Sequence, residues 1–148
     1  MVQKLSVFAF VLLVGSTAAS AQSTTAGRIK SATGVVHVLH AGSDVPAQAG
    51  HTVYQGDLIR TGRDGRIGVT LNDDTRLSLG PDSELRLDRF SYAPADGQLG
   101  LAIKLIRGVA AYVSGRIAKL APDSIRIETP TAILGVRGTT LAIRAGSV

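Results

Sequence analysis

The chain has 148 residues, of which 45% are hydrophobic and 18% are charged, and it contains no cysteine. A length of this order favours one domain, and the hydrophobic share excludes a disordered or collagen-like chain. The lack of cysteine excludes a disulfide scaffold, a thiolate metal site and a cysteine nucleophile. The formal net charge of +5 is a modest excess of positive charge.

The first 21 residues have the features of a secretory signal peptide. Lys4 precedes a largely apolar run over 5–14, and the small residues that end at Ala21 form an A-x-A cleavage site. An uncleaved membrane anchor is the alternative, but the apolar run is about half of the roughly 20 residues that a transmembrane helix needs. We therefore expect cleavage after Ala21 and a periplasmic or secreted protein with one domain over 22–148 and no membrane span.

After the leader, apolar and polar residues alternate in short runs, which is typical of β-strands. Ile67, Val69 and Leu71 share one face at a period of two, and apolar residues alternate with charged ones over 84–89. The expected strands are 34–39, 57–61, 66–71, 75–79, 83–90, 99–106, 109–113, 124–129 and 139–144.

This pattern predicts an all-β fold, a single compact β-sandwich or roll of about nine short, mostly antiparallel strands without a helix. Gly108 is expected to end one strand. The segments 66–71, 75–79 and 84–89 are interpreted as successive strands of one antiparallel meander, with a solenoid-like stack as the alternative.

No constellation of residues predicts an enzyme, a metal site or a cofactor. His37 and His40 fall on opposite faces of a strand and so do not predict a metal pair. Asp73 and Asp74 lack a calcium-loop framework around them and are expected at a hairpin tip. The serine-hydrolase elbow, the dinucleotide-binding glycine motif and the phosphate-binding lysine loop are all missing from the sequence.

Arginines are spread along the chain rather than clustered, and aromatic residues make up only 4% of it. This composition argues against nucleic-acid binding, because single-strand binders stack bases on aromatic side chains. Most of the arginines are interpreted as solvated strand faces. The remaining hypothesis is attraction to anionic envelope polymers around Arg76, Arg86 and Arg89.

Three stretches resemble the FecR-type domain, an all-β module of bacterial envelope sensors. They are a glycine-led strand at Gly34–Val38, a Gly-Asp signature in 56–62, and a Thr-Pro pair that precedes Gly-Val-Arg-Gly-Thr in 129–139. The similarity covers about 28–144. The motif positions are Gly56, Asp57, Thr61, Gly62, Thr129, Pro130, Gly135, Arg137, Gly138 and Thr139.

Simple physical roles are expected for the first motif. Gly56 and Asp57 predict a turn in which the carboxylate accepts backbone N–H bonds. Gly62 and Gly65 are expected to supply positive φ angles at the hairpin that follows.

In the second motif, the glycines on either side of Arg137 are expected to allow a bulge or a close approach between 132–134 and 139–143. Arg137 itself is expected to hold the fold by bonding carbonyls or a carboxylate such as Asp57. Contact with a partner is the alternative role for this arginine.

In iron-responsive systems, proteins of the FecR family join a cytoplasmic anti-sigma segment and one transmembrane helix to a periplasmic domain that receives a signal from a transporter. Here the expected signal peptide takes the place of the first two parts, so direct control of transcription is not expected. The resemblance implies a stand-alone exported domain that binds or senses an envelope protein, by strand addition near Leu141–Ile143. The alternative is a module that binds the cell wall or an anionic polysaccharide. The sequence predicts neither the partner's identity nor the oligomeric state.

Overall fold

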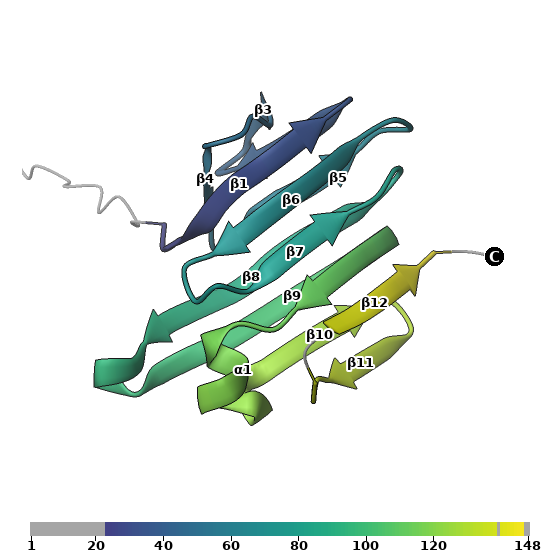
Figure 1. The fold of residues 1–148 in the computed structure, drawn as a ribbon. Coiled ribbons are helices and arrows are strands. Elements are labelled where there is room, and N and C mark those ends of the chain that lie inside the picture. Colours follow the sequence, from purple (N-terminus) through teal and green to yellow (C-terminus); the bar gives the residue numbers. More distant parts are fainter. Residues whose placement is uncertain (1–22, 139, 147–148) are drawn as a thin grey trace, which may run out of the picture.

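A computed structural model describes residues 23–138 and 140–146 of the chain (Figure 1). The expected signal peptide and its cleavage site lie outside the described residues, as does Thr139. The strands are β1 (Thr25–Thr33), β2 (Val36–His40), β3 (Ser43–Pro46), β4 (Thr52–Tyr54), β5 (Leu58–Thr61), β6 (Arg66–Leu71), β7 (Arg76–Leu79), β8 (Glu84–Ala93), β9 (Gln98–Val113), β10 (Ile125–Thr129), β11 (Ala132–Gly135) and β12 (Thr140–Ala145). Three short helical segments are η1 (Pro94–Asp96), α1 (Arg116–Leu120) and η2 (Pro122–Ser124).

The strands form two layers that share β9. Sheet A has the strand order β4-β1-β6-β7-β9-β12, and β1, β6 and β7 lie side by side in Figure 1. Sheet B has the order β3-β2-β5-β8-β9-β10-β11. All pairs are antiparallel except β9 with β10. The fold is therefore one curled sheet, in which the long strand β9 belongs to both layers.

One hydrophobic core fills the space between the layers, because each strand turns its apolar face inward. Ile67, Val69 and Leu71 of β6 are buried as their spacing predicts, and the residues between them are not. The alternating charged strand β8 likewise buries Leu85 and Leu87. Burial of these apolar faces is the main favourable contribution to folding.

The all-β prediction is confirmed, and several details of it are corrected. The sequence pattern missed β1, β3, β4 and β11, and it excluded the five-residue helix α1, which is present. The expected meander is wrong at its third strand, because β7 pairs with β6 and β9 whereas β8 pairs with β5 and β9. Among the described residues, no helix has the length and hydropathy needed to cross a membrane.

Gly108 does not end a strand but marks the point at which β9 passes from sheet B to sheet A. Residues up to Arg107 pair with β8, and residues from Gly108 onward pair with β12. Gly108 has a φ of +90°, and a Cβ atom there would lie 2.1 Å from Ser83 Oγ. The Ser83 hydroxyl accepts a bond from the Val109 N–H at 2.9 Å and lies 3.2 Å from the Val109 carbonyl oxygen. Only glycine allows this crossing without strain.

We therefore expect Gly108→Ala to lower the free energy of unfolding by about 2–4 kcal/mol, because it combines an unfavourable φ with a backbone clash. Chemical denaturation measures this loss. Gly97→Ala is the matched control, since Gly97 has a φ of +66° but no atom within 4 Å of the added Cβ. An equal loss in the two variants would contradict the role of the Ser83 contact.

The largest fully buried side chain is Tyr112, which points from β9 into the core. Its hydroxyl has no hydrogen-bond partner among the described residues. Burial, followed by the negative charge of Asp73, raises the pKa of Tyr112 to about 12 from 10.0. The folded state therefore resists ionisation of this phenol.

Because the unfolded chain loses the Tyr112 proton first, we expect the stability of the fold to fall as the pH rises from about 10 to about 12. The predicted loss is about 2–3 kcal/mol. Tyr112→Phe should reduce this fall and keep native stability at pH 7, because the hydroxyl makes no bond there. Thermal melting of both proteins across this pH range tests the prediction, and identical pH profiles would contradict it.

Candidate functional site

The Gly-Asp motif forms a tight turn between β4 and β5. The Asp57 N–H donates to the Tyr54 carbonyl at 3.2 Å, and Gly56 has a φ of +91° at the third turn position, which favours glycine. The turn is tied to β8, because the Gly56 N–H donates to the Leu87 carbonyl and the Leu87 N–H donates to the Asp57 carbonyl. The first motif thus fixes the end of β4 against the neighbouring sheet.

The carboxylate of Asp57 is almost completely buried and both of its oxygens have partners. Oδ2 accepts the Tyr54 N–H at 2.9 Å, which confirms the predicted bond to a backbone N–H. Oδ1 lies 2.5 Å from Nδ1 of His40, whose side chain is 35% exposed. The His40 ring in turn packs against the Tyr54 ring, with centroids 4.5 Å apart. Three strand ends of the two layers therefore meet around one buried acid.

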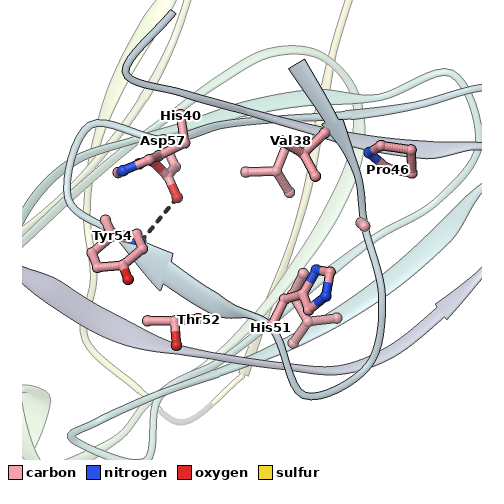
Figure 2. Close-up of a pocket in the computed structure, with 10 residues that line it drawn as sticks. Val38, His40, Pro46, His51, Thr52, Tyr54 and Asp57 are labelled. Carbon is pink, nitrogen blue, oxygen red and sulfur yellow. Dashed lines mark hydrogen bonds and ion pairs between the residues drawn. The ribbon is translucent and has the colours of Figure 1, made fainter. Parts of the chain in front are cut away.

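This cluster forms one wall of a cleft that opens between the two layers, at the edge where β3 and β4 lie. Figure 2 shows His40, Asp57 and Tyr54 gathered on one side of the cleft, away from Pro46. The cleft has a volume of about 280 Å³, and apolar side chains make up most of its wall. Its lining residues are Ile29, Val38, His40, Val45, Pro46, Ala47, His51, Thr52, Tyr54 and Asp57.

The cluster gives the wall of the cleft a hydrogen-bonding side chain, His40. An Nδ1–H of His40 that donates to Asp57 leaves Nε2 as a hydrogen-bond acceptor in the neutral ring. Asp57 orients that imidazole, but no serine, threonine or cysteine hydroxyl or thiol is bonded to it in the described part of the chain. Within residues 23–138 and 140–146, no three His, Cys, Asp or Glu side chains are grouped to hold a metal ion.

Thr61 and Gly62 support the sheet rather than the cleft. The buried Thr61 hydroxyl donates to the Gly80 carbonyl at 2.7 Å and accepts the Ser83 N–H at 2.9 Å. The expectation of positive φ at Gly62 and Gly65 is wrong, since neither has one. The reason for glycine at these positions is crowding, because a Cβ on Gly65 would lie 2.2 Å from the Val35 carbonyl oxygen.

The second motif lies on and after the β10–β11 hairpin. Thr129 Oγ1 accepts the Ala132 N–H at 3.1 Å, and Pro130 occupies the exposed turn. The expected close approach at Gly135 and Gly138 is wrong, because β11 pairs with β10 whereas β12 pairs with β9. A Cβ on either glycine would meet nothing within 4 Å. This segment instead carries the chain from the edge of sheet B to the edge of sheet A.

Arg137 does not reach Asp57. The two residues lie at opposite edges of the curled sheet, and both oxygens of Asp57 have nearer partners in His40 and Tyr54. Arg137 is exposed and lines a shallow hollow of about 290 Å³ with Pro122 and Asp123. The motif residues are therefore not brought together in one site, and the structure assigns them to two separate ends of the fold.

The three arginines expected to form a basic surface also lie apart. Arg76 is on β7 in sheet A, whereas Arg86 and Arg89 are on β8 in sheet B. Arg86 is in addition paired with Asp88, and this bond raises the pKa of the arginine further. These three arginines therefore do not form one continuous surface.

Two important residues escaped the sequence analysis. His40 gave no local sign of its partner, because Asp57 lies 17 positions away. Ser83, which ties Thr61 to Gly108, appeared only as the first residue of an alternating strand. Only the pairing of distant strands shows what these side chains contact.

We expect Asp57→Asn to lower the free energy of unfolding by about 1–3 kcal/mol, because the amide has one acceptor oxygen where both carboxylate oxygens now accept, from His40 and from the Tyr54 N–H. Asp44→Asn is the matched control. Asp44 bonds His37 at 2.9 Å in the same Asp–His arrangement, but both side chains are more than one third exposed. Such a surface pair contributes about 0–1 kcal/mol. Denaturation curves test the difference, and equal losses would contradict the importance of the buried turn.

Comparison with known proteins gives one family. The sequence model of the family described as FecR protein matches residues 57–147, more than half of the chain. This range begins at the buried acid of the cleft and extends through two of the edge strands, β11 and β12. No curated protein and no solved structure matches the chain.

Proposed function

Because the chain belongs to the FecR family, we propose that it is a non-catalytic module of the cell envelope that binds another protein. The family is known from envelope signalling, and a role outside the cytoplasm agrees with the expected signal peptide. The observation that carries the proposal is the free edge of sheet A at β12. A partner binds there by adding a strand.

β12 is the longest of the four edge strands in the described structure. Its six residues pair with β9 on one side and with no other described strand. The other edges are shorter, at four residues in β3, three in β4 and four in β11. Proline ends β3, which is a common means of blocking an edge. β12 has no proline and only one charged residue, Arg144.

The side chains of β12 also leave room for a partner. Ile143 and Ala145 are buried, but Leu141 faces the core and is only half-buried. An added strand would cover Leu141 with its own inward side chain and continue the core. Backbone hydrogen bonds would supply affinity, and pockets for alternate side chains would supply selectivity.

The proposal predicts that a photo-crosslinking amino acid at Thr140, introduced into the protein in its native host, captures one envelope protein. The same crosslinker at Asp44, on the opposite edge strand β3, is the control and should not capture it. Mass spectrometry identifies the captured protein. Capture of the same proteins from both edges, or from neither, would contradict binding at β12.

A second variant tests the mode of binding. Proline at Leu141 or at Ala142 removes one N–H, and on an edge strand alternate N–H groups point outward. The variant that has lost an N–H bonded to β9 should melt at a lower temperature. The variant that has lost an outward N–H should keep the native melting temperature, and we expect it to lose the crosslink to the partner. Retention of the crosslink would exclude strand addition and would leave β12 as a contact surface only.

A further inference from the structure

The positive charge of the protein is distributed unevenly between the two layers. The strands unique to sheet B carry four acidic residues, and these form ion pairs with Arg60, Arg86, Arg107 and Arg126, and with His37. The strands of sheet A carry no acidic residue. Leaving aside the shared strand β9, their cations are Arg28, Lys30, Arg66, Arg76 and Arg144, all exposed, and none is in an ion pair within the described chain. The strands of sheet A therefore present cations on their outer face without acidic partners on the same strands.

Strand register arranges this face in rows that run across the strands. The central row has only small side chains, each paired directly with the next: Ser31, Gly68, Ser78, Ala111 and Ala142. Arg28 and Arg76 belong to the row on one side, separated by Thr70. Arg66 and Arg144 belong to the row on the other side, together with Val109.

The surface is hollowed along the central row. Hollows of about 640 Å³ and about 350 Å³ both include Gly68 and Ser78, so they adjoin there. The two arginine rows are four residues apart along a strand, which corresponds to about 14 Å. Within a row, Arg28 and Arg76 are two strands apart, or about 10 Å, which is close to the length of a disaccharide. Asp74, in the turn between β6 and β7, lines the larger hollow at its side and pairs with Arg116 at 3.2 Å.

We propose that this face of sheet A binds a linear polysaccharide that carries carboxylates along its length. The chain lies in the channel across the strands, over Gly68, Ser78 and Ala111, and its carboxylates meet the arginines of the two flanking rows. Guanidinium groups suit carboxylates because they donate two parallel hydrogen bonds. Affinity comes from these contacts and from released counterions, so it does not require aromatic stacking.

Other anionic partners fit this face less well. Single-stranded nucleic acid needs aromatic platforms, and no aromatic side chain lies in the three rows. A membrane surface needs apolar side chains that insert, and the rows offer only Val109 and Val113. A protein interface needs a well-packed core rich in large side chains, whereas the floor of this channel holds only glycine, serine and alanine.

Calorimetric titration of the purified protein with a galacturonate oligomer, long enough to cross sheet A, tests the proposal. We expect binding at low salt that weakens as salt is added. Arg66→Gln combined with Arg76→Gln should weaken it about tenfold or more, because one arginine is lost from each row. The control is Arg86→Gln combined with Arg126→Gln on sheet B, which removes the same charge and should change binding by less than about twofold.

A second pair of variants tests the shape of the channel at constant charge. Ser78→Ile fills the floor and should weaken binding, whereas Ala102→Ile, on the outer face of sheet B, should not. Absence of binding, or equal weakening by the matched variants, would overturn the proposal. Equally tight binding of a glutamate peptide of the same charge, or of anionic phospholipid vesicles, would overturn the assignment to a polysaccharide. None of these variants touches β12, so strand addition is tested separately.

Discussion

The crossing of β9 from one layer to the other depends on the contact between Gly108 and Ser83. At this point the backbone takes a φ of +90° and approaches Ser83 too closely for any Cβ atom. Ser83 is held in place by Thr61, whose hydroxyl accepts the Ser83 N–H. Through these bonds β5, β8 and β9 are fixed together, and the curled sheet closes around one core. The free edge strand β12 and the outer face of sheet A both belong to this curled sheet.

The family motifs therefore preserve the shape of the fold more than a common site. Asp57 organises a turn and orients His40 at one edge, and Thr61 supports the β9 crossing. The motif around Arg137 carries the chain from the edge of sheet B to the edge of sheet A.

Sheet A is the layer that faces partners in both proposals. Its edge strand β12 is open, and its outer face carries cations without acidic neighbours. Sheet B differs because Arg60, Arg86, Arg107 and Arg126 pair with Glu84, Asp88 and Glu128. Arg144 stands at the junction of the edge and the face. A protein on β12 and a polysaccharide across the strands would thus bind next to each other.

The sequence by itself determined that the chain is all-β, that Ile67, Val69 and Leu71 point inward, and that Asp57 accepts a backbone N–H at a turn. These features are local, because alternation sets the face of a strand and turn chemistry acts over four residues. Tertiary structure decided the partner of His40, the crossing at Gly108 and the gathering of arginines that are scattered along the chain. Each of these depends on which distant strands lie side by side, and the period-two pattern is the same whichever neighbour a strand has.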